Sequence, residues 1–158
     1  MKRGTTVFLK AALIVIGLLV LGLCIFALPR LAGYSAETFP EYASLRYPVL
    51  IGMYVTVIPF FIGLFQAWRL LQYIEKNEAF SKLAVGSLGL IKVCAAVIGA
   101  IYIIGMVVLF VQNALHPGIA LMGLVIVFAT LVVSVFAAVL QALLKNAIEF
   151  KEENELTI

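Results

Sequence analysis

The sequence predicts an all-α integral membrane protein, a four-transmembrane-helix up-down bundle with cytoplasmic N- and C-termini. Of its 158 residues, 65% are hydrophobic and only 12% are charged, and the mean hydropathy is +1.18. Soluble domains are about half apolar and about a quarter charged, so the bilayer must be the solvent for most of this chain. We expect a single polytopic domain with spans near 8–28, 48–74, 83–113 and 118–146 and a short tail, 147–158.

The first span follows from a long uncharged run behind a basic N-terminus. Ala11–Pro29 carries no charge, and its length crosses a hydrocarbon core of about 30 Å. A cleaved signal peptide is the rival interpretation, but the run exceeds the usual apolar region of about 7–15 residues. Bulky Tyr34 also occupies the best cleavage-like triplet. We therefore expect an uncleaved helix that ends at Pro29.

A neutral loop and a second span come next. Residues 30–47 contain several aromatic residues typical of a membrane interface, and a short surface helix is expected near Pro40–Arg46. An interfacial loop is favoured over a ligand site there. Tyr47–Trp68 is uncharged, with Pro48 at a tolerated first-turn position and Pro59 inside the span. The helix is expected to continue to Ile74 or Glu75.

A polar island, residues 71–90, separates the second and third spans. Asn77 suits the end of a helix because asparagine tolerates the left-handed conformation. Ser81 suits an N-cap, and Phe80 with Val85 has the spacing of a hydrophobic staple. A structural turn is the favoured interpretation, and a binding site is the alternative.

The run Val93–Leu144 has no formal charge with His116 neutral, and it is too long for one span. The turn His116-Pro117-Gly118 divides it into two helices. Lys92 lies near the start of the third helix, and its side chain is expected to extend back toward the 75–82 loop. Small residues at helical spacing, such as Ala95 and Gly99, favour either intramolecular packing or contact in a homo-oligomer.

The distribution of basic residues predicts the orientation. Nine of the eleven Lys and Arg residues fall on the side of the termini and the 75–82 loop, and the other two are Arg30 and Arg46. The positive-inside rule then places both termini in the cytoplasm and the protein in the cell membrane. Because topology explains these charges, no direct nucleic-acid binding is expected.

The sequence contains little that could perform catalysis. There is no Asp, and all eight Glu lie in loops or the tail, which argues against a proton-coupled exchanger with a membrane-embedded carboxylate. His116 is the only histidine, and Cys24 and Cys94 lack a CxxC spacing. We expect a protein that is not an enzyme, with no catalytic residues, no cofactor and no metal site.

Two short motifs carry a resemblance to a known family. The stretch 77–81, NEAFS, and the ending 153–158, ENELTI, resemble the bacterial membrane-protein family labelled "domain of unknown function 2975", with Glu155 where Asp is commoner. The family has no assigned activity, but its members often neighbour a small helix-turn-helix transcription regulator. The resemblance therefore implies a non-enzymatic membrane partner of such a regulator. A transporter or carrier of a small ligand through the bundle interior is the alternative.

The motif positions supply the candidate residues for partner binding or tail docking. They are Asn77, Phe80, Ser81, Asn154, Leu156 and Thr157. Both motifs fall on one predicted face of the membrane, so we hypothesise that residues 154–158 fold back onto the loop around 77–81. Burial of Leu156 would stabilise that arrangement. The rival is a solvated chain end, the default for termini.

Overall fold

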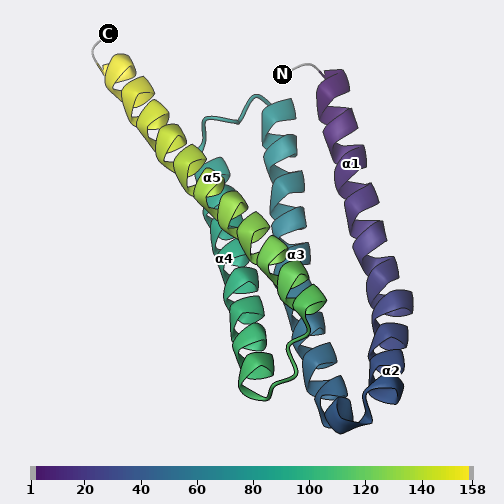
Figure 1. The fold of residues 1–158 in the computed structure, drawn as a ribbon. Coiled ribbons are helices and arrows are strands. Elements are labelled where there is room, and N and C mark those ends of the chain that lie inside the picture. Colours follow the sequence, from purple (N-terminus) through teal and green to yellow (C-terminus); the bar gives the residue numbers. More distant parts are fainter. Residues whose placement is uncertain (1–2, 157–158) are drawn as a thin grey trace.

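The computed structural model describes residues 3–156, apart from the side chains of Ala43 and Arg46. Within these residues, four helices are long and apolar enough to cross a membrane. They run alternately up and down, as predicted (Figure 1). The start of the first helix, the loop of residues 76–81 and the end of the last helix lie together at one end of the molecule, here called the loop end.

The first span is longer than predicted because Pro29 does not end it. Helix α1 (Arg3–Gly22) continues through a π-helical turn, η1 (Leu23–Ala27), into α2 (Leu28–Thr38). In the π-turn the Leu28 N–H donates to the Leu23 carbonyl five residues back, so the chain gains one extra residue ahead of the proline. Pro29 then occupies the first turn of α2, where proline is tolerated. Much of the predicted first loop is therefore helical.

The second span follows a tight connection. A 3₁₀ helix, η2 (Pro40–Leu45), occupies the position of the predicted surface helix, and α3 (Arg46–Glu75) follows directly. Pro59 lies inside α3 without ending it, as predicted. The nearby Thr56 hydroxyl donates to the Met53 carbonyl, three residues back, at 2.6 Å.

The last two helices form a hairpin. Helix α4 (Lys82–Val111) and helix α5 (Pro117–Leu156) are joined at the end opposite the loop end. His116 is the turn residue expected, because its Nδ1 accepts the Gly118 N–H at 3.0 Å and so caps the start of α5. Helix α5 is ten residues longer than predicted at its C-terminal end, since it continues beyond 146 to Leu156.

The helices pack as an open series. Close backbone contacts join α1 to α3, α3 to α4 and α4 to α5, and α5 crosses α4 obliquely (Figure 1). Only 6–17% of the residues in the most apolar stretch of each span are buried inside the protein. Most apolar side chains therefore face outward, as expected of helices whose solvent is lipid.

Candidate functional site

The loop of residues 76–81 has the backbone that the sequence predicts. Asn77 adopts a left-handed conformation with φ of 59°, and the Glu78 N–H bonds back to the Tyr73 carbonyl at 2.7 Å, which closes the end of α3. The Ser81 Oγ accepts the Ala84 N–H at 3.3 Å, the N-cap expected for α4. Phe80 is 61% exposed, so a staple with Val85 can cover only part of its ring. Two of the three candidate residues here thus have a structural role.

The tail does not fold back onto this loop. Leu156 is 86% exposed at the end of α5, and the last turns of the helix point away from the other helices (Figure 1). The tail was predicted to fold back, but residues 147–156 continue α5 as a straight helix. The helix satisfies their backbone hydrogen bonds and carries these residues away from the loop. The docking hypothesis is therefore wrong for Leu156. Asn154 lies on the same exposed extension, and Thr157 lies outside the described residues.

A polar network joins α4 and α5 inside the apolar region. The Lys92 Nζ donates to the Gln141 Oε1 at 3.1 Å, and the Gln141 Nε2 donates to the Val85 carbonyl at 3.2 Å. The Ser134 hydroxyl bonds to the Lys92 carbonyl at 3.0 Å. Gly89 leaves room for the amide, since a Cβ there would lie 2.7 Å from the Gln141 Nε2.

This network accounts for the position of Lys92. Its ammonium reaches toward the loop end, as predicted, because Gln141 lies level with the first turns of α4. A charge within the hydrocarbon costs about 2.5–3.5 kcal/mol on insertion scales, so the amide partner matters. Sequence reasoning missed the partner. The signal was available, because Gln141 is the only polar side chain between Ser134 and Lys145 in α5.

A second polar contact accompanies the π-turn. The Tyr54 hydroxyl of α3 donates to the Cys24 carbonyl at 2.6 Å. In the π register the donor for this carbonyl would be the residue five positions on, which is Pro29, and proline has no N–H. Tyr54 therefore supplies the missing hydrogen bond to a carbonyl that lipid could not satisfy. The sequence offered Pro29 as the only hint of this contact.

The loop end is also tied together by charge. The Lys10 Nζ of α1 lies 2.8 Å from the Glu75 Oε2 at the end of α3, and 5.0 Å from the centre of the Trp68 ring. These contacts hold the first helix against α3 at the loop end. At the opposite end, the Tyr42 hydroxyl donates to the Asn113 carbonyl at 2.8 Å and links η2 to the α4–α5 turn.

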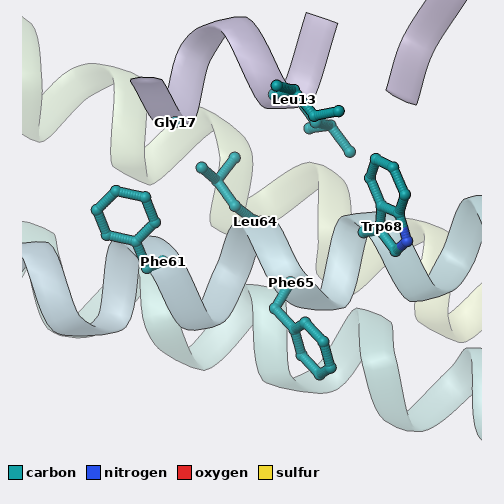
Figure 2. A pocket seen from close by; sticks show the side chains of 7 residues that line it. Leu13, Gly17, Phe61, Leu64, Phe65 and Trp68 are labelled. Atoms are coloured by element: carbon teal, nitrogen blue, oxygen red, sulfur yellow. The ribbon is translucent and has the colours of Figure 1, made fainter. Parts of the chain in front are cut away.

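Two apolar grooves are present. The first, of about 280 Å³, lies between α1 and α3, where Leu13 and Gly17 face Leu64 and Trp68 (Figure 2). The second, of about 270 Å³, lies at the loop end between α3, α4 and α5. Neither resembles a reaction centre, because both are lined almost entirely by apolar groups. Residues 3–156 hold no cluster of three or more His, Cys, Asp or Glu side chains that could bind a metal.

Comparison with known proteins identifies the family. The model of the family described as "Protein of unknown function (DUF2975)" matches residues 30–158. The chain belongs to the DUF2975 family. The chain is also similar to the uncharacterized membrane protein YoaS of Bacillus subtilis (strain 168), with 52% identity over 160 residues that cover 100% of both chains. No solved structure matches it.

These matches confirm two predictions. The resemblance carried by residues 77–81 and 153–158 led to the right family, and the match begins at Arg30, so it covers three of the four spans. The assignment to a membrane also stands, since the relative is described as a membrane protein and the fold has four candidate spans. The roles of the individual motif residues in DUF2975 stay predictions.

Proposed function

We propose that this protein is a non-enzymatic membrane partner of a small cytoplasmic helix-turn-helix regulator, and that the loop end faces the cytoplasm. The observation that carries the proposal is the exposed extension of α5. Leu144 still lines the groove between the helices, whereas the twelve residues that follow it, ending at Leu156, continue as helix. Ala147 and Ile148 are still half-buried, and the eight residues from 149 to 156 are all exposed, so at 1.5 Å per residue the helix projects about 12 Å beyond the packed region.

The extension carries an acidic face. Glu152 and Glu153 follow Glu149 by three and four residues, so each lies on the same side of the helix as Glu149, and all three are exposed. Phe150 and Leu156 are exposed beside them. A helix that presents carboxylates around apolar side chains suits a partner with a basic surface and apolar pockets.

A DNA-binding regulator has such a surface, because it must neutralise phosphates with Lys and Arg. An acidic helix that binds this surface would compete with DNA. Binding at the membrane would therefore withhold the regulator from its target sites. This mechanism needs no catalytic residue and no ligand pocket.

The alternative, transport through the bundle interior, receives less support. Both grooves are apolar, and between α4 and α5 the Lys92 ammonium donates to the Gln141 side chain while the Ser134 hydroxyl donates to the Lys92 backbone carbonyl. A continuous polar path for a solute is not evident among the described residues. The extension of α5 would also have no role in a carrier.

Co-purification tests the proposal. The chain, tagged at its N-terminus to leave the tail unaltered, is extracted from its native membrane in mild detergent. A stoichiometric soluble DNA-binding protein is expected. Combined substitution of Glu149, Glu152 and Glu153 by Lys should abolish its recovery.

The matched control reverses two carboxylates at the opposite end, Glu37→Lys and Glu41→Lys, and should leave the partner in place. Retention of the partner by the triple variant would exclude the acidic face as its binding surface. Absence of any soluble partner from the wild-type preparation would overturn the proposed function.

A further inference from the structure

We propose that α3 and α4 hold a buried water molecule between them, bound to the side-chain amide of Gln66 in a space beside Gly63. The site lies within the membrane-spanning part of both helices. It does not depend on the proposed partner, which concerns the far end of α5.

Two buried polar side chains lack a hydrogen-bond partner among the described residues. Four polar side chains are buried, and Thr6 and Thr56 both have interaction partners. Gln66 is 7% exposed and Ser87 is 4% exposed, and the structure of residues 3–156 gives neither of them a hydrogen bond. A serine hydroxyl can rotate toward a carbonyl of its own helix. The Gln66 amide is harder to satisfy, because it has an oxygen and two N–H groups.

Gln66 lies on the side of α3 that meets α4. Gly63, three residues earlier, is at this contact, because a Cβ built on it would lie 3.8 Å from the Cys94 Cβ of α4. Leu70, four residues later, lines a groove together with residues of α4. Residues three and four apart share a helix face. Leu64, which faces α1, is two positions from Gln66 and so points to another side (Figure 2).

Lipid cannot satisfy the amide at this depth. Gln66 precedes Glu75, the last residue of α3, by nine residues, which is about 13 Å along the helix. An amide without a partner is unfavourable in hydrocarbon. Gln141 of α5 avoids this problem, since it bonds to the Lys92 ammonium and to the Val85 carbonyl. Gln66 has no equivalent partners among the described residues, so we look for one outside the chain.

Gly63 leaves room for such a partner. Beyond its own helix backbone and chain neighbours, a Cβ built on Gly63 would have one atom of the described residues within 4 Å, the Cys94 Cβ at an ordinary van der Waals distance of 3.8 Å. A methyl-sized space therefore adjoins the glycine. Side chains on a helix lean toward the preceding turn, so the Gln66 side chain is directed toward the level of Gly63. It does not fill the space itself, because none of its atoms lies within 4 Å of that Cβ.

Water suits both the space and the amide. A water molecule is about the size of a methyl group, and it can donate to the Gln66 Oε1 or accept from the Nε2. The Cys94 thiol is a weak additional partner, and the carbonyl oxygens of α3 beside Gly63 each have a second lone pair. A lipid chain would offer the amide no hydrogen bond. A cation would need acidic ligands, and Glu75 is the one acidic residue of α3 and α4.

Nuclear magnetic resonance of the full chain in deuterated detergent tests the proposal. Labelling with ¹⁵N-glutamine gives signals from four side chains, and Gln66→Met assigns the Gln66 signal by removing it. Magnetisation transfer from water to the Gln66 Nε2 protons is expected, with NOE and ROE of opposite sign. That sign difference identifies a water that stays bound while the protein tumbles. Gln112, which is exposed at the opposite end, should show only the weak transfer typical of surface water.

A second variant fills the space and keeps the amide. Gly63→Ala adds a methyl group that needs no movement of Cys94, and it should abolish the water signal at Gln66. The matched control is Gly52→Ala in the same helix, where an added Cβ has no atom within 4 Å among the described residues. This control should retain the signal. Circular dichroism checks the helical content of each variant, and the wild-type measurement is decisive by itself if Gly63→Ala does not fold.

Several results would overturn the proposal. Absence of water transfer to Gln66 in the wild type would exclude a bound water, and an unaltered signal in Gly63→Ala would exclude this space. NOE and ROE of the same sign would indicate chemical exchange with bulk solvent in an open cavity. A contact between the Gln66 amide protons and the Ser87 side chain, without water transfer, would show that the two side chains bond directly.

Discussion

Single polar side chains in this protein satisfy groups that lipid cannot. Tyr54 bonds to the Cys24 carbonyl, and Gln141 bonds to the Lys92 ammonium. In a soluble protein, water could replace either partner, but within the hydrocarbon there is none. Each of these two hydrogen bonds leads to a prediction. In each case one substitution removes the hydrogen bond, and a second substitution makes that hydrogen bond unnecessary.

Tyr54→Phe should destabilise the fold by about 1–3 kcal/mol, because it leaves the Cys24 carbonyl without a donor. Pro29→Ala restores a backbone N–H at the position from which the π register would draw that donor. In the Pro29→Ala background, Tyr54→Phe should therefore cost much less. Denaturant unfolding in detergent of the wild type, the two single variants and the double variant measures how far the two effects depend on each other. An equal loss of unfolding free energy from Tyr54→Phe in both backgrounds would contradict this account.

Gln141→Leu should destabilise the α4–α5 pair by about 1–3 kcal/mol, because the Lys92 ammonium loses the oxygen to which it donates. Removal of both partners, in Lys92→Met with Gln141→Leu, should recover most of that stability. The same unfolding measurement applies. A double variant less stable than Gln141→Leu would show that the lysine is stabilised by something other than this amide.

At the scale of elements, the residues that cap the helix ends already have a structural role. Asn77 and Ser81 end α3 and begin α4, so part of the loop motif is explained by local geometry. In the tail motif, by contrast, Leu156 is 86% exposed at the end of α5. The loop motif is thus explained in part by helix ends, and the role of the tail motif stays a prediction.

Leu156→Asp should leave the free energy of unfolding within about 0.5 kcal/mol of the wild type, because the side chain is already exposed. Its effect should appear instead in recovery of the proposed cytoplasmic partner. Thermal unfolding in detergent, measured beside partner recovery, separates the two roles. A fall in thermal stability would indicate that the tail contacts the rest of the fold in the membrane.

At the scale of the whole molecule, the arrangement of the spans is open. Helix α1 packs on α3, but it has no close packing on α5, so the chain does not close into a ring of four helices. The Lys10–Glu75 pair and the Tyr54 hydroxyl are two polar contacts between the first span and α3. This span is the one with the least interhelical support.

The orientation of the whole molecule is tested by reporter fusion. The sequence assigns nine basic residues to the side of the termini and two to the other side, so a reporter joined after Ile158 should be active only as a cytoplasmic fusion. A reporter inserted in the first connection, near Phe39, should show the opposite result. An extracytoplasmic signal at the C-terminus would reverse the topology and remove the basis of the proposed partner.

The sequence by itself determined the membrane class, the number and order of the spans, the loop-end caps and the family. These properties follow from local composition and from residue types at fixed spacing, which need no knowledge of neighbouring helices. The turn at His116 and the tolerance of Pro59 were predictable for the same reason.

The tertiary structure alone decided the rest. Pro29 fails to end the first span because a π-turn precedes it and Tyr54, thirty residues after Cys24, donates a hydrogen bond to the Cys24 carbonyl. The partner of Lys92, the groove between three helices and the extended course of the tail also depend on which helices meet. Apolar helices in lipid have many faces of nearly equal hydrophobicity, so the pattern of apolar residues does not reveal which faces pack.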